Sequence, residues 1–174
     1  MPPDPQIYAL AEQVGERFRR EGRTLAVAES CTGGLLGAAL TDVPGSSVYF
    51  LGGVISYADP VKVEQLGVPV ATLRRHGAVS EQTAAAMASG VRARLQADVG
   101  VSITGVAGPD AEGSKPVGLT FIGIATPTVP STASGGGESV TTHRFQWTGD
   151  RWDNRHRSVI AALELLARAP ELLR

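Results

Sequence analysis

Residues 24–34 read TLAVAESCTGG, and this stretch decides the fold. The apolar run LAVA at 25–28 predicts a buried strand. The polar run ESCT then interrupts it, and Gly33 and Gly34 open a run with apolar residues at helical spacing over 35–40. The pattern therefore predicts a strand, a tight turn and a helix.

A strand-to-helix turn in an open α/β sheet lies at the carboxyl edge of the strands, where ligands bind. Glycines let backbone N–H groups approach a ligand there, and the N-terminus of a helix favours negative charge. This turn also places the hydroxyl of Ser30 beside the thiol of Cys31. It can therefore be an anion cradle with a nucleophile, or the capped start of a helix in a Rossmann-like core.

The composition indicates one globular domain over residues 1–174. Hydrophobic residues make up 43%, and 16 basic against 17 acidic residues give a net charge of -1. This balance argues against nucleic acid or a membrane surface as a partner and favours a small-molecule substrate. A single cysteine excludes an internal disulfide, and neither a membrane-spanning stretch nor a secretory signal is evident. We therefore expect a cytoplasmic protein.

The basic residues are fourteen arginines and only two lysines, Lys62 and Lys115. Lysine differs from arginine because burial can strip its proton near neutral pH. We expect Lys62 in the first turn of a helix that is capped by Asp59 and has Pro60 at its first position. The positive end of the helix dipole disfavours a cation there.

The rest of the chain predicts a mixed, mostly parallel sheet that ends in an antiparallel hairpin. The first three strands alternate with helices, whereas the last two follow one another. The stretch 128–139, rich in Ser, Thr and Gly, is expected to be a mobile hairpin tip. The expected strands span about 25–28, 52–57, 99–104, 116–126 and 140–147, and the expected helices about 6–21, 35–42, 60–65, 70–75, 81–96 and from 150 onward.

Three strand exits carry unusual polar chemistry, at 30–34, 57–62 and 104–108. If the first three strands are parallel, these exits meet at one edge of the sheet. The glycine loops match neither the Walker A pattern nor the complete dinucleotide fingerprint. No spacing of His, Cys, Asp or Glu resembles a metal site, so His76, His143 and His156 are interpreted as structural.

Six motifs follow one another along the chain: AESCTGG at 28–34, PGSSVYFLGGVISY at 44–57, HGAVSE at 76–81, SITGVAGPD at 102–110, KPVG at 115–118 and GDR at 149–151. Together with Lys62 they resemble the CinA C-terminal domain family, from about Leu10 to Leu166. The resemblance implies a three-layer α/β/α sandwich, a homodimer, and a stand-alone enzyme without a cofactor that hydrolyses nicotinamide mononucleotide to nicotinate mononucleotide and ammonia. The stretch 128–139 looks longer than a typical hairpin of the family.

Amide hydrolysis needs a nucleophile, a base, an acid for the departing nitrogen and donors for the oxyanion. In the interpretation that the resemblance supports, Ser30 attacks the carboxamide, and neutral Lys62 accepts its proton directly or through Ser47. Tyr57 orients Lys62, stacks on the nicotinamide ring, or is an ordinary aromatic at a strand end. The oxyanion donors are expected among the N–H groups of Thr32, Gly33 and Gly34.

The second glycine loop is expected to hold the 5′-phosphate of the substrate. Its N–H donors would come from Thr104, Gly105, Ala107 and Gly108, with Arg151 or Lys115 as the charge partner.

Two alternatives stay open. Cys31 is a rival nucleophile if it loses its proton at the helix start, although a small buried residue is the simpler interpretation. The chain can also be a non-catalytic nucleotide-binding or regulatory module, which ammonia release from nicotinamide mononucleotide would distinguish. A DNA-associated role finds no basic patch to support it.

Overall fold

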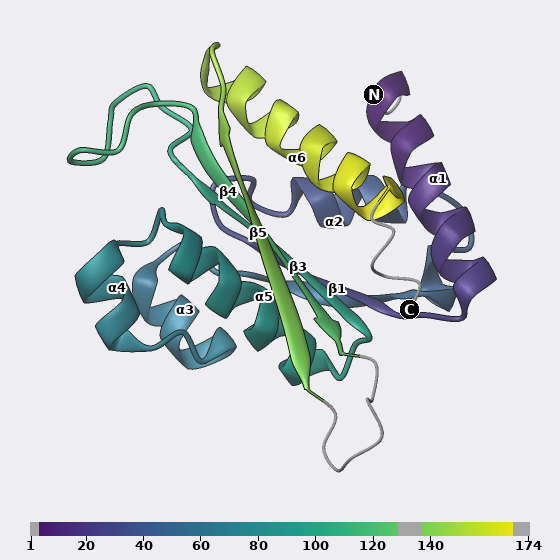
Figure 1. Ribbon diagram of the computed structural model, residues 1–174. Coiled ribbons are helices and arrows are strands. Elements are labelled where there is room, and N and C mark those ends of the chain that lie inside the picture. Colours follow the sequence, from purple (N-terminus) through teal and green to yellow (C-terminus); the bar gives the residue numbers. More distant parts are fainter. Residues whose placement is uncertain (1–3, 129–136, 169–174) are drawn as a thin grey trace.

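The structure, a computed structural model, describes residues 4–128 and 137–168. Five strands form one sheet in the order β2-β1-β3-β4-β5, between two layers of helices (Figure 1). This confirms the expected α/β/α sandwich. The strands are β1 (Leu25–Glu29), β2 (Phe50–Ile55), β3 (Val99–Gly105), β4 (Leu119–Pro127) and β5 (Glu138–Gln146). The helices are α1 (Pro5–Glu21), α2 (Leu35–Thr41), α3 (Asp59–Leu66), α4 (Val70–His76), α5 (Glu81–Leu95) and α6 (Arg151–Arg168), with one 3-10 turn, η1 (Ser46–Val48).

Strands β1, β2 and β3 are parallel, with β1 in the middle of the three. Strand β4 runs antiparallel to β3, and β5 antiparallel to β4. Because the first three strands point the same way, their carboxyl ends share one edge of the sheet. The predicted meeting of three strand exits is therefore built into the topology.

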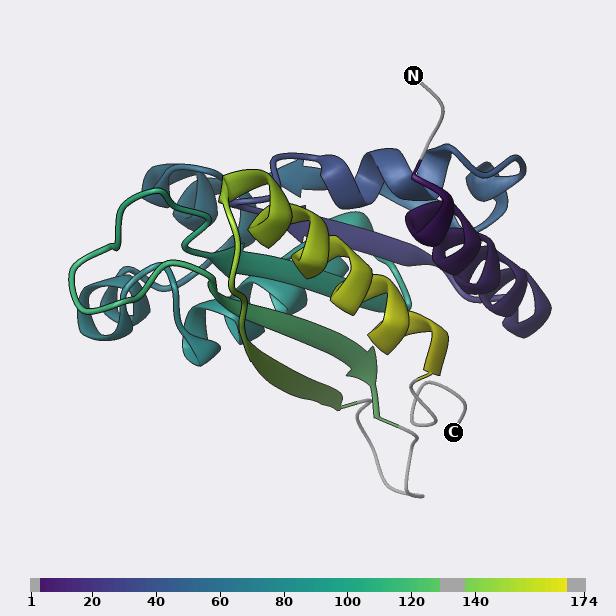
Figure 2. The same ribbon diagram turned by 90° about the horizontal axis from the view of Figure 1, so that it is seen from above.

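The two helical layers bury different sides of the sheet. Helices α1, α2 and α6 cover one face, where the larger apolar cluster includes Phe18, Leu36 and Leu163. Helices α3, α4 and α5 cover the other face (Figure 1). On that face α5 lies so close that a Cβ at Gly100 would sit 2.3 Å from the carbonyl oxygen of Ala88. Figure 2 shows α6 beside α1 on the same face of the sheet. The first turn of α6 reaches the edge where the strand exits meet.

The sequence placed β2 about two residues late, at 52–57. In the structure β2 begins at Phe50, because Phe50 already pairs with Leu25 of β1. Tyr49, directly before the strand, is part of the core and is fully buried. Its neighbours Val48 and Leu51 remain 67% and 46% exposed. Of these three apolar residues, Tyr49 therefore belongs to the core, whereas Val48 and Leu51 lie at the surface.

The final hairpin is longer than expected. Strand β5 already begins at Glu138, whose side chain pairs with Arg92 of α5 at 2.9 Å. The N–H of Thr128 donates to the carbonyl of Gly137 at 2.8 Å, which continues the pairing beyond β4. Residues 129–136 of the expected mobile tip lie outside the described residues.

No helix within 4–128 or 137–168 has the length and apolar character needed to cross a membrane. In the same ranges, no three His, Cys, Asp or Glu side chains gather closely enough to hold a metal ion.

Candidate active site

The exits of β1, β2 and β3 open into one pocket of about 270 Å³. That volume is near the lower end for small-ligand sites, roughly 300–1,000 Å³. Three strand exits, the loop before α5 and the first residue of α6 contribute to its wall. The lining residues are Ser30, Cys31, Tyr57, Asp59, Lys62, Ala78, Val79, residues 104–108, Asp110, Glu112 and Arg151.

Ser30 is the first residue after β1, and the sheet fixes its position. Its N–H donates to the carbonyl of Ile103 in β3 at 3.0 Å, and its own carbonyl accepts from Gly33 at 3.1 Å, which closes the turn. The residue is 8% exposed and borders the pocket. A hydroxyl is thus presented to the cavity from a rigid backbone.

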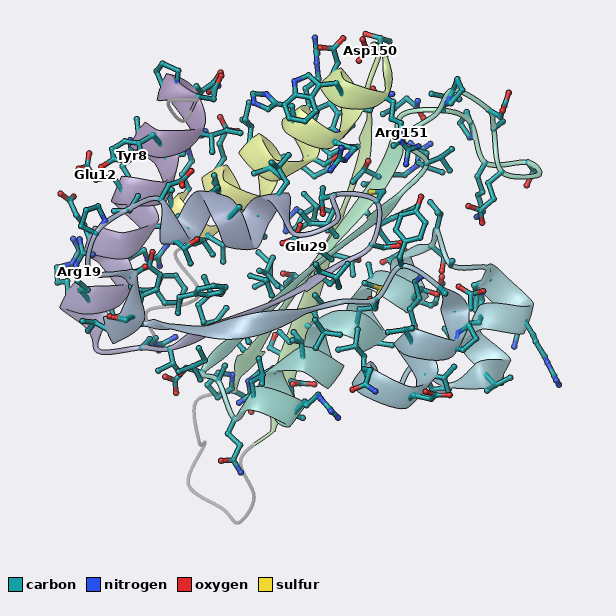
Figure 3. The ribbon with its side chains drawn as sticks, turned by 180° about the vertical axis from the view of Figure 1, so that it is seen from behind. Tyr8, Glu12, Arg19, Glu29, Asp150 and Arg151 are labelled. Carbon is teal, nitrogen blue, oxygen red and sulfur yellow. The ribbon has the colours of Figure 1, made fainter. Side chains whose placement is uncertain are left out.

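The anion cradle predicted at the start of α2 is filled by the chain's own Glu29. Its Oε2 accepts from the N–H groups of Gly34 at 3.0 Å and Leu36 at 3.1 Å, and its Oε1 from Gly37 at 2.8 Å. Figure 3 shows Glu29 at the start of α2. The expectation of free N–H donors at Gly33 and Gly34 is therefore wrong, since the buried carboxylate and the turn itself occupy them.

Lys62 lies in α3 and is only 1% exposed. Helix α3 begins at Asp59 after an N-cap at Ala58, one residue earlier than expected and without a side-chain cap. The Nζ of Lys62 donates to the backbone carbonyl of Tyr57 at 2.9 Å and lies 3.5 Å from Oδ1 of Asp59. The amine is thus held at the pocket wall by the carbonyl of Tyr57 rather than by its ring.

The exit of β3 forms the opposite wall of the pocket. Thr104 donates through its hydroxyl to the carbonyl of Ala78 at 2.8 Å, which joins this exit to the loop before α5. Gly105 has no room for a side chain, because a Cβ there would lie 2.7 Å from the carbonyl oxygen of Leu119. Residues 104–108 all line the pocket, and the exit of β3 is thus packed tightly against β4.

Arg151, the first residue of α6, joins two of the strand exits. Its guanidinium donates through Nη1 to the carbonyl of Gly108 and through Nη2 to the hydroxyl of Tyr57, the latter at 3.2 Å. Tyr57 is 61% exposed, so this bond lies at the mouth of the pocket. Figure 3 shows Arg151 beside Asp150 at the start of α6.

Asn154 and Arg155 extend these contacts along the same helix. Asn154 donates through Nδ2 to the carbonyl of Ala107 at 3.0 Å, and Arg155 donates through Nη2 to the carbonyl of Thr32 at 2.8 Å. Positions three and four residues after Arg151 lie on one face of a helix. One face of α6 therefore contacts the exits of β1, β2 and β3.

Cys31 borders the pocket, yet its thiol is poorly suited to attack. Burial raises the pKa of the Cys31 thiol from 9.0 to about 11, and the charge of Glu29 adds to this effect. The backbone N–H of Cys31 and the charges of Arg155 and Arg151 act in the opposite direction and are outweighed. Since the thiolate is the nucleophilic form, little of it exists near pH 7.

The sequence matches the CinA C-terminal domain over residues 7–169. The chain belongs to the CinA C-terminal domain family. CinA-like proteins of Nostoc sp. and Thermosynechococcus vestitus are 47% and 50% identical to it over 171 and 162 residues, which cover 92% and 91% of this chain. The chain spans little more than a third of the length of these relatives, 38% and 37%.

Solved structures of CinA proteins share the fold. The competence/damage inducible protein CihA of Agrobacterium tumefaciens superposes with a TM-score of 0.83 and 37% identity, covering 94% of both chains. The competence or damage-inducible protein of Enterobacter asburiae gives a TM-score of 0.85 and 29% identity, covering 95% of this chain and 99% of its own. These matches confirm the fold predicted from the CinA motifs.

Two residues of the CinA motifs lie away from the pocket. Ser47 is exposed in η1, which precedes β2, whereas Lys62 follows the other end of that strand. Within one chain Ser47 therefore cannot pass a proton between Ser30 and Lys62. Lys115 is half-buried and pairs through its backbone with Glu112, so its side chain is not part of the lining.

Five residues near the site were missed from the sequence. Asp110 stood inside a quoted motif, and Asp59 and Glu112 bordered others, but carboxylates on loops usually face solvent. Asn154 and Arg155 could have been found from helical spacing, because they share a face with Arg151 of the GDR motif. What the sequence could not supply was the direction in which that face points.

Proposed function

We propose that this chain hydrolyses the carboxamide of nicotinamide mononucleotide, releasing nicotinate mononucleotide and ammonia. The observation that carries the proposal is that the serine Ser30 and the buried lysine Lys62 lie on the wall of the same pocket. The resemblance to the family supplies the substrate. The glycine-rich exit of β3 on the opposite wall supports a nucleotide as ligand, since exposed backbone N–H groups bind phosphate.

In the proposed reaction Ser30 Oγ attacks the carboxamide carbon while Lys62 Nζ, as a neutral amine, accepts the hydroxyl proton. As the tetrahedral intermediate collapses, the carbon–nitrogen bond breaks and Lys62 returns the proton to the departing nitrogen, which leaves as ammonia. An ester on Ser30 remains. Water attacks it with Lys62 again as the base, which regenerates the Ser30 hydroxyl and releases the acid.

The carbonyl of Tyr57 would hold the amine during these steps. A neutral Lys62 can donate one N–H to that carbonyl and keep its lone pair for the proton of Ser30. Because Gly33 and Gly34 already use their N–H groups, we assign the oxyanion to the N–H of Cys31, which lines the pocket.

Arg151 is the cation that we assign to the 5′-phosphate. Its guanidinium already contacts the carbonyl of Gly108, so a phosphate on the N–H groups of residues 107 and 108 would lie beside it. Three carboxylates, Asp59, Asp110 and Glu112, also line the pocket. Asp59 already lies 3.5 Å from Lys62 Nζ, so we assign Asp110 and Glu112 to the positively charged pyridinium ring and the ribose hydroxyls.

Ammonia release from nicotinamide mononucleotide by the purified protein tests the proposal. Ser30→Ala and Lys62→Met should each lower kcat by on the order of a thousandfold or more, with the far-ultraviolet circular dichroism unchanged. Ser47→Ala and Lys115→Met are matched controls of the same residue types outside the pocket. Near-normal turnover in either pocket variant removes the proposed dyad. Binding of the nucleotide without ammonia release favours a regulatory module.

We also propose that two copies of the chain pair through β2. This strand is at the edge of the sheet, where Leu51 and Ile55 expose apolar side chains at 46% and 56%, and Val48 of η1 just before it is 67% exposed. An exposed apolar edge of this kind invites pairing with an identical strand. Light scattering should give about twice the 18.1 kDa of one chain, and Leu51→Lys should reduce it to a monomer. A monomeric wild-type protein contradicts this.

A further inference from the structure

Arg155 stands directly behind the turn that carries Ser30. Its Nη2 donates to the carbonyl of Thr32 at 2.8 Å, and that carbonyl lies within the turn closed by the bond from Gly33 to Ser30. Arg155 is not part of the pocket lining, so it reaches the cavity only through the turn. A change at Arg155 therefore acts on Ser30 without removing a surface that a ligand would touch.

The guanidinium of Arg155 is held at an energetic disadvantage. In the described part of the chain it forms no ion pair, and its Nε is buried without a hydrogen-bond partner. Beyond the Thr32 carbonyl, its neighbour is the Trp152 ring, whose centroid is 5.7 Å from Cζ. A buried unpartnered donor lowers stability, whereas an apolar side chain at this position of the helix would not. Such a local conflict is typical of functional sites.

The position of Arg155 also brings positive charge to the turn. The charge acts on the residue after Ser30, since it opposes the rise in the pKa of the Cys31 thiol. A hydrogen bond to the Thr32 carbonyl polarises the Thr32–Gly33 peptide and strengthens the Gly33 N–H as a donor to Ser30. The hydrogen bond thus tightens the turn, and the charge favours negative charge beside Ser30.

We propose that Arg155 is a positioning residue of the site: through the carbonyl of Thr32 it holds the turn of Ser30 in the geometry that presents the hydroxyl to the pocket. It belongs to a face of α6 whose other two members, Arg151 and Asn154, hold the exits of β2 and β3. Helix α6 thereby contacts all three loops, in addition to the backbone bonds from Ser30 to Ile103 and from Ser56 to Glu29 that join them at the sheet edge. The kinetic part of this inference rests on the proposed function, whereas the structural part does not.

Hydrogen–deuterium exchange of the whole chain tests the structural part without any substrate. In Arg155→Ala the amides of residues 33–37 should exchange at least tenfold faster than in the wild-type protein, and Arg155→Lys should lie between the two. Arg157→Ala is the matched control, an exposed arginine two residues further along α6, and should match the wild type. Unchanged exchange at 33–37 in Arg155→Ala overturns the proposal. If that variant does not fold, the same comparison is made with Arg155→Gln and Arg155→Lys.

Turnover of nicotinamide mononucleotide tests the kinetic part. Arg155→Ala should lower kcat about ten- to a hundredfold while KM changes less than threefold, because the substrate contacts remain and only the turn of Ser30 loosens. Arg155→Lys should recover part of kcat, and added methylguanidinium should rescue Arg155→Ala. A rise in KM with kcat unchanged overturns the positioning role, since it would make Arg155 a substrate contact. A wild-type protein that releases no ammonia counts against the proposed function and leaves the exchange result standing.

Discussion

The carboxylate of Glu29 accepts the backbone N–H of Gly34 at 3.0 Å, inside the glycine turn where the sequence suggests an anion site. The helix start does bind an anion, but the anion belongs to the chain. A buried carboxylate and the unpaired amides of a helix N-terminus satisfy one another. Ligand binding is thereby displaced from the start of α2 to the pocket beside it, where Ser30 is exposed to the cavity.

Glu29→Gln should lower the free energy of unfolding by about 2–4 kcal/mol, because the amide cannot accept all three N–H groups and leaves a buried donor unpaired. Urea unfolding measures the loss. Glu16→Gln, an exposed glutamate of α1, should change stability by less than about 0.5 kcal/mol. A similarly small effect at Glu29 would show that the Glu29 carboxylate does not support the turn.

Most of the fold followed from local patterns, and the site followed only in part. The turn at 29–34 and the parallel order of the first strands predict that Ser30, Lys62 and residues 104–108 come together, because parallel strands end at one edge. The role of Glu29 could not be predicted, because the sequence does not indicate where a glutamate side chain at the end of a strand points. Ser47 shows the converse limit: a motif can be adjacent in sequence to the site and lie at the other end of the strand.

Cys31 should be nearly inert to iodoacetamide in the folded protein. With its pKa raised to about 11, only about one thiol in a thousand is ionised at pH 8, and the rate of alkylation should rise about tenfold per pH unit. Mass spectrometry of the intact chain follows the reaction. Cys31→Ala should retain ammonia release from nicotinamide mononucleotide, and its loss would transfer the nucleophile's role to the thiol.

The raised pKa of the Cys31 thiol also predicts that the protein loses stability at alkaline pH. A thiol whose pKa is raised by folding contributes stability that is complete below about pH 9 and is lost as the pH rises toward about 11. The difference in unfolding free energy between wild type and Cys31→Ala should therefore shrink by up to about 1.4 kcal/mol per pH unit in this window. Burial also raises the pKa of Tyr49, but this contribution is common to both proteins. A difference that stays constant from pH 8 to 10.5 contradicts the shift.

Gly105→Ala should disrupt the wall that we assign to the phosphate. A Cβ would meet the Leu119 carbonyl oxygen and the Thr120 hydroxyl at 2.7 Å each, so the exit of β3 must move. We expect a loss of about 1–3 kcal/mol in stability and a rise in KM for nicotinamide mononucleotide. Gly37→Ala in α2 is the matched control, because its Cβ would meet only ordinary contacts of 3.6 Å or more, with side chains of β1 and β2. Equal stability and equal KM in the two variants would show that the β3 exit tolerates the alanine side chain.

The carboxylates of Asp110 and Glu112 predict that the pocket distinguishes substrates by the charge of the ring. Nicotinamide mononucleotide and its reduced form share the carboxamide, ribose and phosphate, but only the oxidised ring is a cation. Two exposed carboxylates should favour the cation by about three- to tenfold at low salt, and less as salt screens them. Ser30→Ala allows both dissociation constants to be measured by calorimetry without turnover. Adding Asp110→Asn and Glu112→Gln to it should bring the two constants together, whereas Glu12→Gln, an exposed glutamate on α1, should not. Equal binding of the two ring forms by Ser30→Ala alone would show that the carboxylates face the ribose or solvent instead of the ring.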